Sequence, residues 1–131
     1  MAPAARRLPV RFDDAVWHEA VRGFSREPLQ IAMSARVAAE RRGVVLADVL
    51  PCQTLGSDGT ELAGCAKLYL PHGDAPPSER PFAFILQLAR EPDATLVWTF
   101  LAFGQRHPRP GVRSAYERAR GPLPGRFPDR A

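Results

Sequence analysis

The stretch FAFILQLAREPDATLVWTFLAF, residues 82–103, decides the fold of this chain of 131 residues. Two runs rich in apolar and aromatic residues, 82–89 and 95–103, flank the polar segment REPD at 90–93. Such residues favour β-strands, and the polar segment suits a hairpin turn. We therefore predict two adjacent, central strands whose alternate residues face a layer of helices. The side chains that we place in these strands are Ile85, Leu86, Leu88, Trp98 and Phe100.

Two amphipathic helices are predicted upstream of this hairpin, after a short β-like run at 8–12. Asp13 and Asp14 are good N-cap residue types for the first helix, and Ser25 for the second, which we expect to stop at Gly43. The apolar positions of the first helix are Val16, Trp17, Ala20, Val21 and Phe24. Those of the second are Leu29, Ala32, Met33 and Val37. We expect the two helices to form a hairpin.

Three further features complete the predicted fold. AGCAKLYL at 63–70 is typical of a strand, and the polar, proline-rich segment at 71–81 is long enough for a mobile or functional loop. Ser114 and Glu117 form a capping box, S-x-x-E, for a short helix that ends at Gly121-Pro122. The predicted fold class is α+β: an N-terminal strand and a helical hairpin packed on a small, mainly antiparallel sheet, with a short C-terminal helix.

Length and composition predict a single domain over residues 1–131, with flexible ends at 1–7 and 122–131. The chain is 45% hydrophobic and 24% charged, which is ordinary for a globular protein. It has neither the apolar run of a signal peptide nor one long enough to span a membrane, so we expect a cytoplasmic protein without membrane contact. Cys52 and Cys65 lack the spacing of zinc ligands and are expected to be buried thiols. The sequence predicts no metal and no cofactor.

Positive charge is concentrated at the C-terminal end of the chain. Of the formal net charge of +4, residues 104–131 contribute seven arginines against Glu117 and Asp129, so that residues 1–103 are slightly acidic. Such a patch attracts phosphates through Coulomb steering and counterion release. A solvated basic tail is the alternative on charge alone. Motifs for nucleotide hydrolysis, serine esterase chemistry or zinc protease chemistry do not occur.

The order of these elements, together with LAGCAKLYL at 62–70, PFAFILQL at 81–88 and LVWTFLAFGQRHP…RSAYERA at the end, resembles the RelE/ParE superfamily of toxin–antitoxin toxins. The resemblance covers roughly residues 8–123. Its most specific part is the last strand running into Gly104 and Arg106, followed by Tyr116 at the start of a helix. The resemblance thus rests on one short motif and on topology.

In the ribosome-dependent RNases of this superfamily, the scissile phosphate is surrounded by a basic residue on the strand equivalent to 65–70, an arginine on the next strand, the arginine after the last strand and a C-terminal tyrosine or histidine. The resemblance therefore implies a site made of Lys67, Arg106 and Tyr116, with His107 beside them.

This chain departs from the pattern at one position of that site and in one connection. The arginine of the second strand falls on Ala83, so either Arg80 reaches in from the preceding loop or the site has lost a charge. The segment PRPGV at 108–112 also lengthens the connection between Arg106 and Tyr116.

Metal-independent RNA cleavage requires a base for the 2′-hydroxyl, positive charge for the phosphorus centre and an acid for the leaving 5′-oxygen. Arg106 suits the phosphate clamp, because its fork can hold two phosphate oxygens. Histidine titrates near neutral pH, which makes His107 the best candidate for the acid or base. Tyr116 either stacks on a base or shares the proton transfer.

The predicted function is that of a RelE-like toxin that cleaves mRNA on the ribosome, inhibits translation and is paired with a cognate antitoxin protein. Further phosphate contacts are expected from Arg80, Arg109, Arg113 and Arg120. The alternative is a non-enzymatic protein, either a gyrase-directed ParE-like toxin or a degenerate member that only engages nucleic acid or an antitoxin, and Ala83 favours it. Structural roles are also open: an exposed turn for His107, core coverage for Tyr116, an outward-facing Lys67, and pairing with Glu117 for Arg113 and Arg118.

Overall fold

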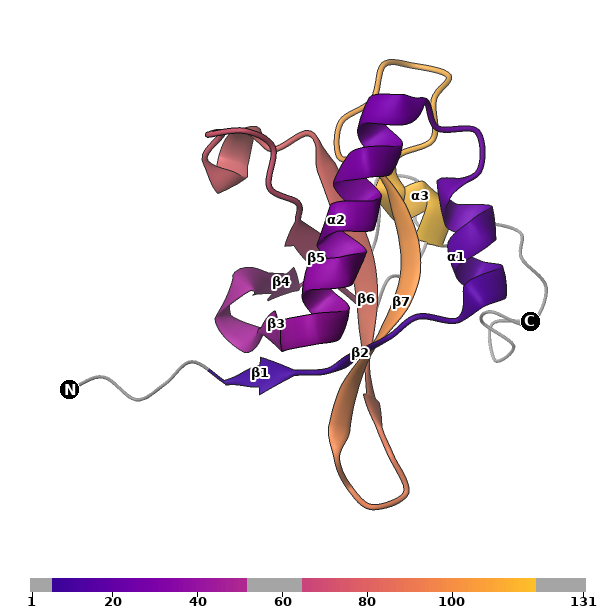
Figure 1. The fold of residues 1–131 in the computed structure, drawn as a ribbon. Helices are drawn as coiled ribbons and strands as arrows, with labels where there is room; N and C mark the ends of the chain where they lie inside the picture. The colour runs from indigo at the N-terminus through magenta and orange to yellow at the C-terminus, as the bar shows by residue number, and fades with distance from the viewer. Residues whose placement is uncertain (1–5, 52–64, 120–131) are drawn as a thin grey trace.

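The computed structural model describes residues 6–51 and 65–119. Within these ranges the chain forms an α+β fold, as the sequence predicted (Figure 1). The strands are β1 (Arg7–Leu8), β2 (Val10–Arg11), β3 (Val44–Val45), β4 (Val49–Pro51), β5 (Cys65–Tyr69), β6 (Phe82–Arg90) and β7 (Leu96–Gln105). The helices are α1 (Asp14–Val21), α2 (Arg26–Arg42) and α3 (Ala115–Ala119), with two short 3-10 helices at Leu46–Asp48 and Pro77–Glu79.

Five strands form the main sheet in the order β2-β7-β6-β5-β4. All its neighbours are antiparallel except β2 and β7, which are parallel. β1 and β3 pair separately, with Arg7 opposite Val45. Arg7, which we placed in a flexible leader, is therefore the first residue of a strand; residues 1–5 and 122–131 lie outside the described residues.

The predicted central hairpin is confirmed. β6 and β7 lie side by side in the middle of the sheet, with Leu86 opposite Phe100 and Leu88 opposite Trp98. β6 continues to Arg90, so the turn falls slightly later than the segment REPD. It is closed by a hydrogen bond from the Glu91 amide to the Thr95 carbonyl of 2.8 Å.

The helix boundaries follow the caps that the sequence indicated. The Asp13 side chain accepts a hydrogen bond of 3.0 Å from the Val16 amide and so starts α1. Ser25 is the N-cap residue of α2, although its side chain makes no capping hydrogen bond. α2 ends at Gly43, where φ is 68° and a Cβ atom would lie 2.7 Å from the Leu8 carbonyl oxygen. Only glycine fits both conditions.

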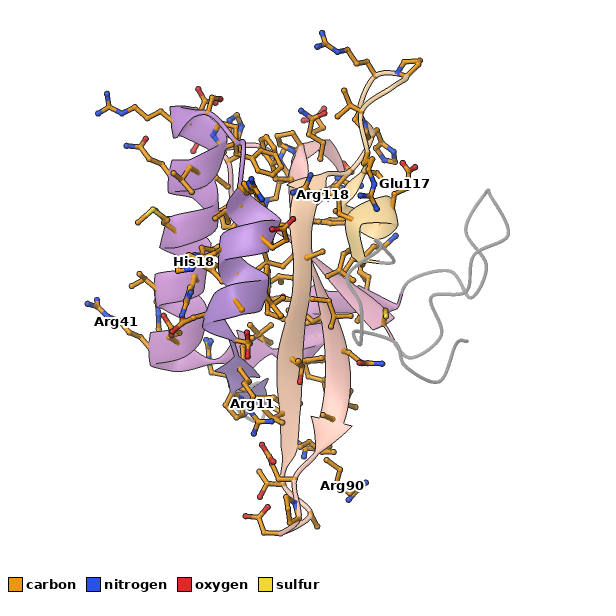
Figure 2. The ribbon with its side chains drawn as sticks, turned by 90° about the vertical axis from the view of Figure 1, so that its right-hand side faces the viewer. Arg11, His18, Arg41, Arg90, Glu117 and Arg118 are labelled. Carbon is orange, nitrogen blue, oxygen red and sulfur yellow. The ribbon has the colours of Figure 1, made fainter. Side chains whose placement is uncertain are left out.

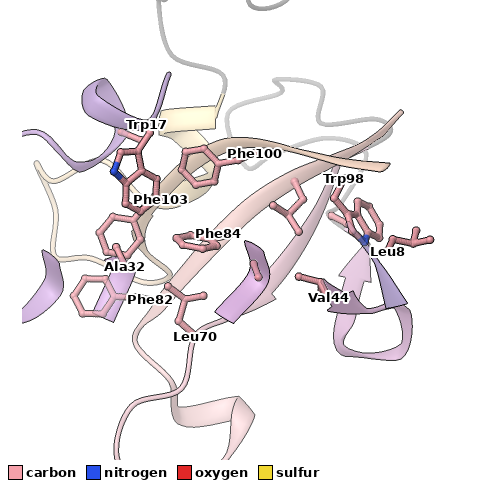
Figure 3. Packing of buried hydrophobic residues seen from close by; sticks show 14 residues of the cluster. Leu8, Trp17, Ala32, Val44, Leu70, Phe82, Phe84, Trp98, Phe100 and Phe103 are labelled. Atoms are coloured by element: carbon pink, nitrogen blue, oxygen red, sulfur yellow. The ribbon is translucent and has the colours of Figure 1, made fainter. Parts of the chain in front are cut away.

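The face of the sheet towards α1 and α2 carries the aromatic core (Figure 3). Phe84 and Phe100 are fully buried, and their ring centroids lie 5.1 Å apart in an edge-to-face arrangement. Trp17 of α1 packs on both, with centroid distances of 6.1 and 5.3 Å. Aromatic pairs in this geometry stabilise a core beyond the area that they bury.

The predicted apolar face of α2 is partly wrong. Met33 and Val37 are exposed, at 52% and 45%, whereas Ala32 and Ala39 are buried. The helix turns its alanines inward because small side chains allow its backbone to approach the aromatic core. A count of apolar residues at helical spacing does not distinguish a stripe of large side chains from a stripe of small ones.

The opposite face of the sheet is covered by α3 (Figure 2). The predicted capping box forms: the Glu117 carboxylate accepts from the Ser114 amide at 3.1 Å, and the Ser114 hydroxyl accepts from the Glu117 amide at 3.2 Å. The predicted end of this helix at Gly121-Pro122 lies outside the described residues, as does Cys52; Cys65 is buried. Among the described helices, none is long and apolar enough to cross a membrane.

Candidate functional site

Strand β5 places two side chains on the face that α3 covers. Ala66 and Leu70 belong to the aromatic core, so the alternating residues Lys67 and Tyr69 point to the other face. Lys67 is opposite Ile85, a residue of the cluster beneath α3, and both Lys67 and Tyr69 are half-buried. β5 therefore presents a lysine and a tyrosine side by side.

Tyr116 reaches the same place from α3. The Lys67 Nζ atom lies 5.6 Å from the centroid of the Tyr116 ring and 5.7 Å from that of the Tyr69 ring. Among the described residues, no carboxylate lies within ion-pair distance of Lys67. The ammonium group thus lies near two aromatic rings, and no described carboxylate neutralises its charge.

Gly104 explains how α3 comes so close to the sheet. A Cβ atom at this position would lie 3.1 Å from both the amide nitrogen and the Cα of Ala115, and 3.0 Å from the Cδ of Arg118. The Arg118 guanidinium fastens the helix by donating to the carbonyls of Phe103 at 3.0 Å and Ala20 at 2.9 Å. Gly104 and Arg118 therefore fix the position of Tyr116, which lies on the same helix.

Arg106 follows β7 directly, and its backbone amide donates to the Pro81 carbonyl at 2.8 Å. Its Nη1 atom donates to the carbonyls of Pro77 at 3.1 Å, Ser78 at 3.3 Å and Arg80 at 2.8 Å. This half of the guanidinium is therefore engaged by the loop before β6. The Nε atom is buried, with no hydrogen-bond partner among the described residues.

The other contacts of Arg106 are aromatic. Its Cζ atom lies 3.6 Å from the centroid of the Tyr69 ring, which is stacking distance. The guanidinium also lies close enough to Tyr116 to lower the pKa of its phenol. Arg106, Tyr69, Tyr116 and Lys67 thus form one cluster, which we call the tyrosine–cation cluster.

The pKa of the Tyr116 phenol is raised above its ordinary value of 10.0, chiefly because the ring is buried. The positive charge of Lys67 opposes the shift, the neighbouring Tyr69 adds to it, and Arg106 opposes it. Tyr116 is therefore protonated at neutral pH and is able to donate a proton or a hydrogen bond.

The structure thus brings together three of the residues that the sequence placed in the site, Lys67, Arg106 and Tyr116. It adds Tyr69, which the sequence reasoning missed. The signal was present, because Tyr69 lies two residues after Lys67 on the same predicted strand and therefore on the same face.

The remaining predicted site residues lie elsewhere or have other partners. His107 is exposed and Arg109 is exposed in the turn after it. Arg113 donates from Nη2 to the Glu117 carbonyl at 2.8 Å and so binds the backbone of α3. Arg120 lies outside the described residues.

Arg80 does not replace the arginine that is missing at position 83. Arg80 donates to the carbonyls of Ala75 at 3.3 Å and Tyr69 at 3.5 Å, so its guanidinium binds backbone oxygens rather than joining the cluster. Ala83 itself is fully buried and lies between Tyr69 and Gly104 in the register of the sheet. The position at which the RelE/ParE pattern has a strand arginine therefore carries no charged side chain.

A groove of about 880 Å³ lies between α2, the β4–β5 edge of the sheet and the loop at 71–81. Apolar side chains such as Ile31, Leu50 and Leu68 form part of its lining. His72 of the loop contacts Glu27 of α2 there, at 3.3 Å. No group of three or more histidine, cysteine, aspartate or glutamate residues is gathered for a metal ion anywhere in residues 6–51 and 65–119.

Comparisons of the chain with models of known protein families, with curated proteins and with solved structures give no match. The features of the molecule that bear on function are therefore the tyrosine–cation cluster and the motif formed by Gly104, Arg106 and Tyr116.

Proposed function

We propose that this chain is the toxin of a type II toxin–antitoxin pair and acts as a ribosome-dependent mRNA endoribonuclease that inhibits translation. The observation that carries the proposal is the convergence of Lys67, Arg106 and Tyr116 from three separate elements, β5, the end of β7 and α3. Two cations beside a protonated phenol form a site suited to a phosphodiester.

Each group has a role that matches its environment. Lys67, which has no carboxylate partner among the described residues, stabilises the negative charge that develops on the phosphate. Tyr116 is protonated at neutral pH and supplies the proton for the leaving 5′-oxygen. Arg106 binds the phosphate with the part of its guanidinium that makes no hydrogen bond to the loop carbonyls. The base for the 2′-hydroxyl is assigned to His107 on its place next to Arg106 in the chain, because its exposed side chain makes no contact with the cluster among the described residues.

The test compares Lys67→Met with Arg109→Met, because each variant removes one positive charge, the first within the cluster and the second outside it. Lys67→Met is expected to reduce mRNA cleavage by about 10²- to 10³-fold, as loss of one transition-state contact does. Arg109→Met is expected to leave cleavage within about threefold of the wild type, because Arg109 is exposed and outside the cluster.

Cleavage is measured in a translating extract by primer extension on mRNA, and binding by co-sedimentation with ribosomes. Wild-type protein that binds ribosomes but never cuts, or equal losses in the two variants, contradicts the enzymatic proposal.

A second candidate function, that of a non-enzymatic binding protein, is favoured by a specific observation. Arg80 and one half of Arg106 bind backbone carbonyls, and Ala83 carries no charge. Fewer cations therefore face a ligand than in the family pattern. A gyrase-directed toxin, or a module that only engages nucleic acid or an antitoxin, predicts similar losses of affinity and salt dependence for each basic residue.

The cellular consequence tests the partners of the proposed toxin, a cognate antitoxin and the ribosome. Induction of the chain alone is expected to slow growth, and co-expression of the product of a neighbouring gene is expected to relieve it. Soluble protein without a growth effect in several hosts contradicts both toxin proposals.

A further inference from the structure

We infer that Tyr69 is a positioning residue of the tyrosine–cation cluster: its ring fixes the plane of the Arg106 guanidinium. The inference rests on the proposed function for its catalytic consequence, but its structural content is measurable without any activity. It begins from the shortest cation–ring contact among the described residues, 3.6 Å from the Arg106 Cζ atom to the Tyr69 ring centroid.

The backbone of Arg106 is separated from Tyr69 by one strand, so its side chain needs a support along its length. Arg106 follows β7, whereas Tyr69 lies on β5, so its side chain reaches across the intervening strand β6. In the register of the sheet, Tyr69 is opposite Ala83, and Ala83 is opposite Gly104. Neither Ala83 nor Gly104 has a side chain long enough to contact the guanidinium. Of these three residues, Tyr69 therefore provides the contact.

The loop carbonyls hold only one end of the guanidinium. The oxygens of Pro77, Ser78 and Arg80 all accept from the same atom, Nη1. These bonds hold the guanidinium at its Nη1 end only, and Nε has no hydrogen-bond partner among the described residues. Stacking against the flat ring of Tyr69 supports the rest of the group, because the guanidinium is itself planar. A fixed plane aims the Nη2 group towards the phosphate that the cluster is proposed to bind.

The ring of Tyr69 carries this role, and its hydroxyl does not contribute to the stack. Tyr69→Phe therefore keeps the support, whereas Tyr69→Leu and Tyr69→Met remove it. The two aliphatic variants differ in shape, so a folding defect in one leaves the other for measurement. Circular dichroism and thermal unfolding establish that each variant is folded.

The first measurement is the ¹H–¹⁵N resonance of the Arg106 Nε–H group in the free protein, assigned by its loss in Arg106→Lys. In the wild type and Tyr69→Phe, we expect a proton shifted by the ring current and protected from exchange, because Nε is buried. In Tyr69→Leu or Tyr69→Met, the ring-current shift is lost and exchange is expected to be about tenfold faster or more. An unchanged Arg106 resonance in a folded aliphatic variant overturns the inference, whatever the activity.

The second measurement is mRNA cleavage in the translating extract. Tyr69→Leu is expected to lower kcat by about 10- to 100-fold, with ribosome binding changed by less than about threefold, and Tyr69→Phe is expected to restore cleavage. A changed Arg106 resonance with normal cleavage overturns the positioning role. If the wild type does not cut, the proposed function fails, while the resonance of Arg106 still decides whether Tyr69 holds it.

Discussion

The two faces of the central sheet differ in the size of the side chains that they present. Towards α1 and α2, β6 and β7 present the rings of Phe84, Phe100 and Phe103, all fully buried. Towards α3 they present Ala83 and Gly104 near the cluster. Large rings fill the first interface. On the second, small residues near the cluster allow the backbone of α3 to approach and leave room for long polar side chains. This part of the sheet therefore contributes less to the apolar core and more to the candidate site.

The largest expected effect breaks the first face. Phe84→Ala is expected to reduce the free energy of unfolding by about 3–5 kcal/mol, because it removes a fully buried ring in contact with Trp17 and Phe100. Leu88→Ala, in the same strand but 43% exposed, is the control and is expected to cost less than about 1 kcal/mol. Urea denaturation followed by tryptophan fluorescence measures both. Equal losses would mean that the aromatic core does not dominate stability.

The next effect concerns the close approach on the second face. Gly104→Ala adds a Cβ atom 3.1 Å from the backbone of Ala115, and backbone gives way less readily than a side chain. We expect a loss of about 1–3 kcal/mol in the free energy of unfolding and a displacement of Tyr116, visible in its ring resonances. Unchanged stability and resonances would show that α3 does not depend on a residue without a side chain here.

The difference between the faces also explains how much the sequence could predict. The hairpin of β6 and β7 and the starts of α1 and α3 follow from local patterns: apolar runs around a turn, Asp13 before a helical repeat, and the Ser114–Glu117 box. Each signal lies within a few neighbouring residues. Such patterns can therefore be recognised in the sequence without knowledge of the tertiary structure.

The errors and omissions arise where contacts join distant segments. The choice of Ala32 over Met33 for the inner face of α2 depends on the aromatic rings that lie beneath it. Arg106 finds its carbonyl partners 26 to 29 residues earlier in the chain, and Tyr69 on another strand. Spacing within one element contains no information on such contacts, so Arg106 was predicted as a phosphate clamp without its loop partners.

A smaller effect compares the N-caps of the helices on the two faces. Ser114→Ala removes the hydroxyl that accepts from the Glu117 amide and is expected to cost about 1 kcal/mol. Ser25→Ala is the matched control, because Ser25 occupies the N-cap of α2 without a side-chain capping bond. Its effect is expected to be within about 0.5 kcal/mol of zero. Chemical denaturation of the two variants in parallel makes the comparison, and a larger loss in Ser25→Ala would contradict the described caps.

The smallest effect is a shift in the titration of one phenol on the second face. Burial raises the pKa of Tyr116 above 10.0, so the unfolded chain loses this proton more readily than the folded one. The corresponding stability is fully present below pH 10 and is lost as the pH rises through the higher pKa of the folded state. Tyr116→Phe is therefore expected to reduce the loss of stability between neutral pH and strongly alkaline pH.

Lys67 provides the sharper version of this test, because its charge opposes the shift. Lys67→Met is expected to raise the pKa of Tyr116 further, whereas Arg109→Met, outside the cluster, is expected to leave it unchanged. An NMR titration of ¹³C-labelled tyrosine, assigned with Tyr116→Phe, follows the phenol directly. A pKa of Tyr116 that does not respond to Lys67→Met would separate the two groups electrostatically. The proposed pairing of a phosphate-binding ammonium with a proton-donating phenol would then lose its physical basis.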